Sequence, residues 1–497
     1  MVLAVIDDDE ISLRNVVLLV SDPVNPLPLG HKVNLKAIVR VQEEIFPAAS
    51  GRRENFQWKF RIKGNDFFLK PHVRPPFTCS APKRRGVCPQ THRGEKLLIL
   101  KIIKNANLLL KRPKIFVGLS GMMRKTTRRW ISHGFDGKRY ETIRKRLEAL
   151  WENEILDRCC VSVLAPRDPQ RPYRENPPES QEDLCRWYND AQWIQERNLE
   201  RIRRTYFAGD AFPCIFPYFG TGGHAKYICA EEKVEYRRDT IWIHPSLSDY
   251  FDYNYEFDPD SNKVFRRELD VVSYLAKEAN GRYFVGMPDN CGSYDALAQL
   301  RGSGELLIDF LDEPEGVKYA AGQLIEILKR SSERFFDAVR ENCLGGSVTS
   351  WMNTWSAGRQ LQLQCDLSVM LSPAVYREFI TPELTETAGW LDNAVYHLDG
   401  MEQIRHLGEI LGVDGIQMIQ WTQVAGQPPV TEFIPVLRRI QKAGKGLVLI
   451  IGKAQLPCLL ENLSSNGLNL IVTNAKDPQE AEEIVRFTEK NTRETPR

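Results

Sequence analysis

The sequence of 497 residues predicts an α/β fold, namely a (β/α)₈ barrel with N-terminal additions. Three observations lead to this prediction. Short apolar runs typical of strands alternate with amphipathic segments typical of helices from residue 263 to residue 490. The number of these strand–helix units favours a barrel. Polar and reactive residues follow the strand-like runs between residues 364 and 421, where a barrel carries its catalytic side chains.

Each element follows from a local pattern. Residues 140–156 place apolar side chains at helical spacing, and Ser372 with Pro373 is typical of a helix start. Residues 211–262 are aromatic-rich, β-like and punctuated by turn residues. Strands are expected at 161–165, 283–287, 347–351, 394–397, 415–420, 446–451 and 468–473. Helices are expected at 140–156, 181–206, 294–300, 305–311, 314–342, 372–390, 403–411, 433–443, 455–460 and 478–488.

Charge and sequence patterning divide the chain into four regions. We expect an N-terminal extension (1–121), a helical and β-rich lead-in (122–262), the barrel (263–490) and a tail (491–497). Residues 51–121 hold 17 Lys and Arg against 3 Asp and Glu, whereas residues 122–497 sum to −9. We interpret the extension either as a disordered basic segment or as sequence that precedes a true start at Met122. We therefore predict no nucleic-acid partner.

Composition also bears on the compartment. No uninterrupted apolar run reaches the roughly 18 residues of a membrane span, so no membrane contact is expected. The eleven cysteines are scattered without repeated spacing, and no basic segment precedes the first apolar stretch. These features predict a cytoplasmic protein with reduced thiols.

Several motifs resemble one known family. The segment CDLSVMLSPAVYREFITPEL (365–384) resembles a signature of the uroporphyrinogen decarboxylase superfamily, which also contains the cobamide-dependent methyltransferases. LRGSGELLIDFLDEPEGV (300–317) is similar to a helix pair of that superfamily. The resemblance covers about residues 140–490 and implies a (β/α)₈ barrel with its active site at the carboxyl ends of the strands. Further segments resemble a bacterial subgroup of unassigned activity: 147–158, 283–289, 396–400 and 419–421.

For the methyltransferases of the superfamily, the resemblance implies a zinc ion held by a His-x-Cys pair and a later Cys. In this sequence His397 and Asp399 stand at the pair, and Asn474 stands at the later position. An imidazole and a carboxylate still bind a divalent metal, so His397 and Asp399 are candidate Zn²⁺ ligands. Alternatively, they hydrogen-bond the substrate without a metal. This resemblance implies methyl transfer from a small methylated substrate to a corrinoid carried by a partner protein.

Two other functions stay open. A cofactor-free decarboxylase of the uroporphyrinogen type needs cationic side chains for a polycarboxylate, but the family's Arg-Gln-Ala-Gly-Arg motif is missing here. Arg301, Arg359 and Arg405 are the remaining candidates for that role. A sugar- or ligand-binding barrel would use walls of tryptophan.

The candidate site residues fall at predicted strand ends. Asp366, His397 and Asp399 are the candidate catalytic residues. Asp366 is a candidate general acid or base, and convergence with Asp399 would raise one of the two pKa values. The oligomeric state stays open, and a homodimer, which is common in the families that the sequence resembles, is one candidate. Candidate substrate-binding residues are Asp289, Trp351, Trp355, Gln420, Trp421 and Asn474.

Overall fold

The computed structural model describes residues 137–495 and six short strands among the first 136 residues. The chain divides into two compact units, Met1–Gly118 and Leu119–Arg497. Apart from these six strands, residues 1–121 and Met122 lie outside those described, so the expected disorder and the expected start at Met122 stay predictions. The first unit holds two three-stranded antiparallel sheets, formed by β1 (Val2–Val5), β2 (Val16–Val20) and β3 (Ala37–Val39), and by β4 (Val41–Gln42), β5 (Trp58–Ile62) and β6 (Asn65–Leu69).

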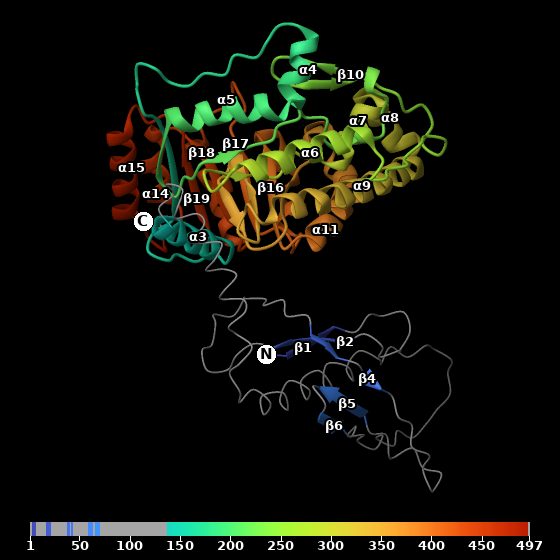
Figure 1. Cartoon of the computed structure of the whole chain (residues 1–497), viewed down its shortest axis with the longest axis horizontal. Coiled ribbons are helices and arrows are strands. Elements are labelled where there is room, and N and C mark those ends of the chain that lie inside the picture. The colour runs from blue at the N-terminus through green and yellow to red at the C-terminus, as the bar shows by residue number, and fades with distance from the viewer. Residues whose placement is uncertain are drawn as a thin grey trace. The chain divides into compact units, whose positions relative to one another are not determined.

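A seven-stranded, mostly parallel sheet lies at the centre of the second unit (Figure 1). Its order is β15-β16-β17-β18-β19-β7-β8, and only β8 runs antiparallel to its neighbour. The first of these strands in the sequence, β7, pairs with the last, β19. The strands are β7 (Cys160–Pro166), β8 (Thr205–Gly209), β15 (Gln360–Leu363), β16 (Asn393–Asp399), β17 (Met418–Thr422), β18 (Gly446–Ile451) and β19 (Leu468–Val472).

Three shorter strand pairs complete the second unit. A backbone hydrogen bond from Met287 N to Val348 O connects two of these pairs, and one from Gly286 N to Ile215 O extends the pairing of β9 with β12. The architecture is thus a mixed α/β fold compatible with the expected barrel. The pairs are the parallel β9 (Cys214–Ile215) and β12 (Phe284–Val285), the antiparallel β10 (Val234–Tyr236) and β11 (Ile241–Ile243), and the antiparallel β13 (Ser347–Thr349) and β14 (Thr354–Ser356).

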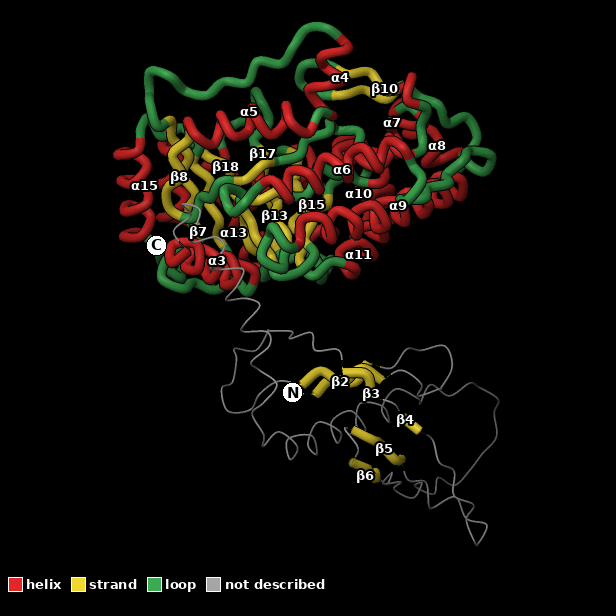
Figure 2. The backbone as a smooth tube through the Cα atoms, in the orientation of Figure 1, coloured by secondary structure: helices red, strands yellow, loops and turns green. Residues whose placement is uncertain are grey.

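Helices flank the sheet in the view of Figure 2. None of the helices within the described residues is long and apolar enough to cross a membrane. The α-helices are α3 (Gly137–Trp151), α4 (Gln181–Asn189), α5 (Ala191–Arg204), α6 (Lys263–Glu278), α7 (Ser293–Arg301), α8 (Ser303–Asp312), α9 (Pro314–Arg340), α10 (Pro373–Val375), α11 (Thr381–Trp390), α12 (Leu407–Leu411), α13 (Ile434–Lys442), α14 (Leu456–Asn462) and α15 (Pro478–Asn491).

Several predicted elements are broken or were missed. The helix expected at 181–206 is two helices, because the Asp190 side chain accepts a hydrogen bond from Trp193 N and starts α5. The helix expected at 372–390 does begin at the Ser372 cap, but a π-helical turn (Tyr376–Ile380) interrupts it. The residues expected to lead into the barrel supply β7 and β8, so they are part of the same sheet.

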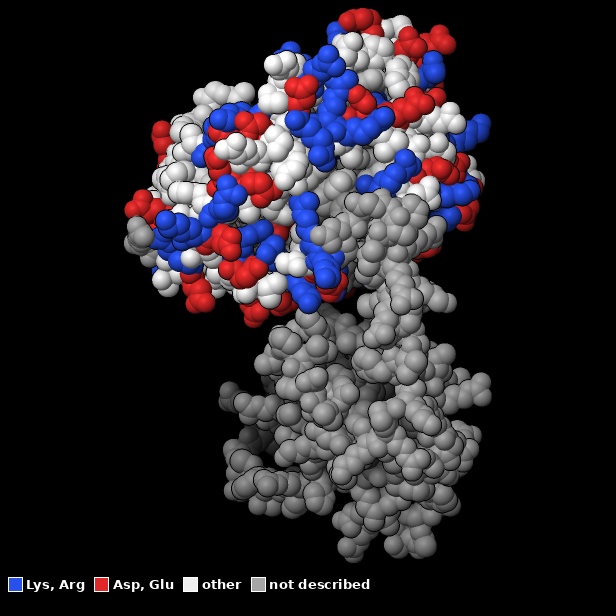
Figure 3. Space-filling view, turned by 60° about the vertical axis from the view of Figure 1, so that its left-hand side comes forward, with Lys and Arg blue, Asp and Glu red and all other residues white. Residues whose placement is uncertain are grey.

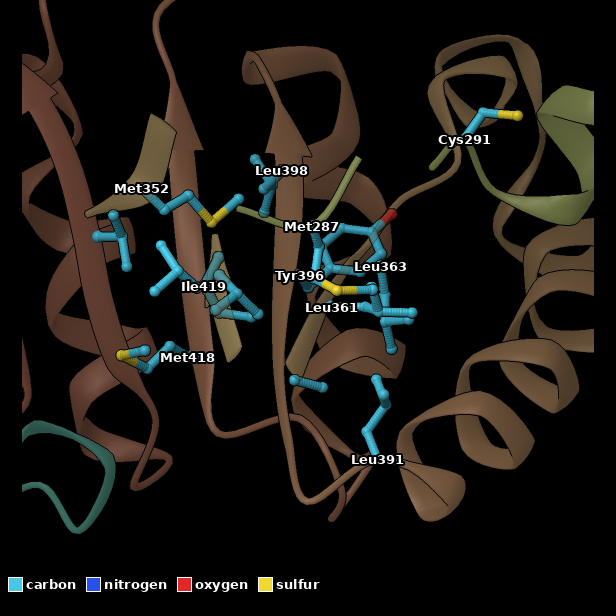
Figure 4. Packing of buried hydrophobic residues seen from close by; sticks show 14 of the residues in the cluster. Met287, Cys291, Met352, Leu361, Leu363, Leu391, Tyr396, Leu398, Met418 and Ile419 are labelled. Carbon is cyan, nitrogen blue, oxygen red and sulfur yellow. The ribbon is translucent and has the colours of Figure 1, made fainter. Parts of the chain in front are cut away.

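The core lies between the sheet and its helices. Figure 4 shows Leu361, Tyr396, Leu398 and Ile419 packed together, and each is at most 2 % exposed. Burial of such side chains stabilises the fold by roughly 1.5–3 kcal/mol each. On the face shown in Figure 3, basic and acidic side chains are interspersed.

Candidate functional site

Three polar side chains meet at the carboxyl ends of β15 and β16. Asp366 begins a 3₁₀ turn, η4 (Asp366–Met370), shortly after β15, while His397 and Asp399 end β16. One ligand atom from each of the three lies within 4.8 Å of the others. Asp366 is exposed, and the other two are half-buried. The structure therefore brings together the three residues predicted to be catalytic.

The orientation of His397 is fixed by β17. His397 lies opposite Gln420 in the strand register, and its Nδ1 atom is 2.5 Å from Gln420 Oε1. Gln420 Nε2 donates to Trp421 O, so the amide oxygen is the atom that faces the imidazole. His397 Nδ1 therefore carries the hydrogen, and Nε2 presents its lone pair. That Nε2 lies 3.9 Å from Asp399 Oδ1.

Amide side chains connect the cluster to Asp289, which follows β12. Gln362 Nε2 donates to Asp289 Oδ1 at 2.6 Å and to Gln364 Oε1 at 3.0 Å. Gln364 Nε2 in turn donates to Asp366 Oδ2 at 3.2 Å. Asp289 is thus linked through two glutamines to Asp366.

The carboxyl groups of Asp366 and Asp289 are hard to ionise. Desolvation raises the pKa of Asp366 to about 7, and the negative charges of Asp399 and Asp289 add to the effect. Water reaches Asp366, but the protein that surrounds this recess still removes part of its hydration. Burial also raises the pKa of Asp289, although the hydrogen bond from Gln362 opposes the shift. Near neutral pH, Asp366 can therefore give up or accept a proton.

Only one of the three predicted tryptophans contacts the cluster. The Trp351 ring lies edge-on to the His397 imidazole, with centroids 5.6 Å apart, and its Nε1 donates to Gln362 Oε1 at 2.7 Å. Trp355 is buried, and its Nε1 donates to Cys343 O. Trp421 packs on Phe433 with centroids 4.6 Å apart. Neither of these two contacts belongs to the cluster.

Asn474 is exposed after β19, and its Oδ1 accepts a hydrogen bond from Lys453 N. It therefore does not complete the group formed by Asp366, His397 and Asp399, within which the candidate ligand atoms converge.

Sequence reasoning missed three residues of the site. Gln362 and Gln364 carry the link just described, and their signal was the alternation of Gln with Leu along residues 360–364. Asp295, in the first turn of α7, accepts hydrogen bonds from the backbone of Asp366 and Leu367. No local pattern marks Asp295, because its contact joins residues far apart in the sequence.

The donor set fits a divalent cation but not a thiol-activating zinc. Two carboxylates and one imidazole are ligands for Mg²⁺, Mn²⁺, Fe²⁺ or Zn²⁺. The hydrogen bond from His397 Nδ1 to Gln420 is the outer contact that metal-bound histidines commonly make. Asp399 and Asn474, which stand where the sequence resemblance would expect thiolate ligands, do not supply sulfur.

Comparison with known proteins gives a structural likeness and no match in sequence. No protein-family model matches the chain, and no curated protein matches it. Among solved structures, the chain is similar to a methyltransferase from Methanosarcina mazei, with 10% sequence identity and a TM-score of 0.47. The match covers 70% of this chain and 98% of that chain.

Proposed function

We propose that the protein is an enzyme with a closed, uroporphyrinogen decarboxylase-like barrel that transfers a methyl group from a small methylated substrate to a corrinoid on a partner protein. The observation that carries the proposal is the convergence of Asp366, His397 and Asp399 within 4.8 Å. Pairing of β7 with β19 supports closure, since it places the first and last of these strands in the sequence side by side, as a barrel requires. The sequence motifs described above support the superfamily.

The three residues would hold a divalent cation. Such a cation would act as a Lewis acid on the oxygen, nitrogen or sulfur atom that bears the methyl group. His397 contributes Nε2, because Gln420 holds the other nitrogen as the hydrogen-bond donor. Asp399 contributes the carboxylate nearest to that nitrogen, at 3.9 Å.

The leaving heteroatom also needs a proton in this proposal. When the methyl carbon leaves the substrate heteroatom, the bonding electron pair stays on that atom, which then takes up a proton. Because a carboxylate that binds a cation stays ionised, this proton would come from solvent water, which reaches the exposed Asp366. Trp351 lies edge-on to His397 and would form an apolar wall beside the methyl group.

The alternatives find less support in the described residues. Arg301 pairs with Asp309 at 2.6 Å, and Arg359 lies 3.6 Å from Asp392, so both guanidinium groups already have carboxylate partners. Arg405 donates to the backbone of its own turn. A polycarboxylate substrate would need such cations free in the cleft. A stacking site for sugars would need more aromatic faces than Trp351 provides.

The decisive experiment combines metal analysis with a turnover assay. Purified full-length protein is analysed for bound metal, then incubated with cob(I)alamin and a panel of methylated amines, thiols and ethers. We expect a stoichiometric divalent metal in the wild type, its loss in Asp366→Asn, and formation of methylcobalamin with at least one donor. Absence of both metal and methylcobalamin would rule the proposal out. Carbon dioxide release from uroporphyrinogen would favour the decarboxylase instead.

A further inference from the structure

The carboxylate of Asp295 is bonded to the turn that bears Asp366. Asp295 Oδ2 accepts a hydrogen bond from Asp366 N at 3.0 Å, and Oδ1 accepts one from Leu367 N at 2.9 Å. The side chain belongs to the first turn of α7 and is 9% exposed. One carboxylate therefore fixes the first two residues of η4.

The start of α7 is itself held firmly against the end of β15. A Cβ atom at Gly292, the residue before α7, would lie 2.1 Å from Gln364 O, so only glycine permits this approach. Glu383 on α11 accepts a hydrogen bond from Ser293 N at 2.6 Å. These contacts leave Asp295 little freedom to move relative to Asp366.

The chemistry of the contact requires a carboxylate. Two adjacent N–H groups point at one side chain, and a carboxylate can accept both because it offers two acceptor oxygens. An asparagine has one acceptor oxygen, and its NH₂ group would face the second N–H donor. Among the described residues, no Lys or Arg forms an ion pair with Asp295, so its role is not that of a salt-bridge partner.

We infer that Asp295 is a positioning residue of the cation site, since it sets the place of the Asp366 carboxylate through the η4 backbone. This inference rests on the proposed function, because it assumes that Asp366 binds a cation. Residues that orient metal ligands from outside typically change metal affinity by about 10- to 100-fold when they are replaced.

The test measures Mn²⁺ binding to the full-length chain. Calorimetry gives the affinity, and electron paramagnetic resonance gives the spectrum of bound Mn²⁺. We expect Asp295→Ala to weaken Mn²⁺ binding by about 10- to 100-fold and to alter the spectrum. Asp295→Asn keeps one acceptor, so its affinity should lie between those of the wild type and Asp295→Ala. Asp190→Asn is the matched control, because Asp190 also accepts a backbone N–H, from Trp193 at the start of α5.

The outcomes separate the inference from the proposed function. Circular dichroism establishes which variants fold. If Asp295→Ala does not fold, the Mn²⁺ affinity of Asp295→Asn alone tests the inference. Wild-type affinity and an unchanged spectrum in the folded Asp295 variants would overturn the inference while the proposed function stands. A wild type that binds neither Mn²⁺ nor Co²⁺ would overturn both. Equal weakening in Asp190→Asn would show a general loss of stability and would also overturn the inference.

Discussion

His397 and Gln420 face each other across β16 and β17, with Nδ1 of the imidazole 2.5 Å from Oε1 of the amide. This contact selects the tautomer whose Nε2 lone pair points toward the carboxylates. We expect Gln420→Leu to lower divalent-metal affinity by about 10- to 100-fold, because it removes the shorter of the two contacts to Nδ1 and leaves the one from Thr422 Oγ1 at 3.1 Å. Titration calorimetry with Mn²⁺ measures the change. Gln420→Glu retains an acceptor and should lose less, and Gln479→Leu on exposed α15 is the control. Equal affinities in all three variants would contradict the assignment.

Trp351 reports on the occupancy of the site. Because its ring lies 5.6 Å from the His397 imidazole, Co²⁺ bound there should quench its fluorescence. We expect Co²⁺ to quench the wild type and to have a much smaller effect on Trp351→Phe. A steady-state fluorescence titration checks this prediction. Equal quenching in both proteins would place the cation elsewhere.

Replacement of Trp355, unlike that of Trp351, should change the stability of the fold and leave Co²⁺ quenching intact. Its ring is 2% exposed, and its Nε1 donates to Cys343 O at 2.9 Å. Trp355→Phe leaves a small cavity and a buried carbonyl without its donor, so the free energy of unfolding should fall by about 2 kcal/mol. Chemical denaturation measures that loss, and Co²⁺ quenching should be retained. Lost metal affinity together with unchanged stability would instead give Trp355 a role in the site.

Glu383 predicts a pH dependence of stability. Burial raises its pKa to about 7, while the backbone N–H of Ser293 opposes the shift, and Oε2 has no hydrogen-bond partner. Between about pH 4.5 and pH 7, the folded state therefore keeps a proton on Glu383 that the unfolded chain releases. The free energy of unfolding of the wild type consequently falls as the pH rises through this range. Glu383→Gln removes the group that ionises.

Relative to the wild type, the free energy of unfolding of Glu383→Gln should rise by on the order of 2–3 kcal/mol between pH 4.5 and pH 8, at about 1.4 kcal/mol per pKa unit. Urea denaturation at several pH values provides the measurement. A constant difference between the two proteins across that range would show that Glu383 does not titrate as described.

Local patterns predicted much of the sheet but missed β8 and β15. The apolar runs of β18 and β19 and the Ser372 cap are visible in sequence, and the structure has them. The strand Gln360–Leu363 alternates Gln with Leu, and its buried glutamines depend on partners that include residues far away along the chain, such as Ser347 and Asp289. Periodicity alone cannot show that a polar face is buried.

The positions of candidate residues at strand ends could be predicted from the sequence. Which face of a strand each residue occupies could not. His397 and Asp399 follow from the end of an apolar strand. Trp421 was expected in the cleft, but β17 extends from Met418 to Thr422, so Trp421 lies within the strand and packs on Phe433 while Gln420 faces His397. A shift of one residue exchanges the two faces of a strand, and sequence gives strand ends less accurately than that.

The pairing of β7 with β19 also constrains how the protein is made. Until the ribosome has released the chain through Val472, β7 has no partner on that side, and its N–H and C=O groups stay open to other chains. Contacts between segments so far apart in the sequence form late, and they slow the folding of the chain. Nascent chains that lack β19 are therefore the species most exposed to aggregation and most dependent on chaperones.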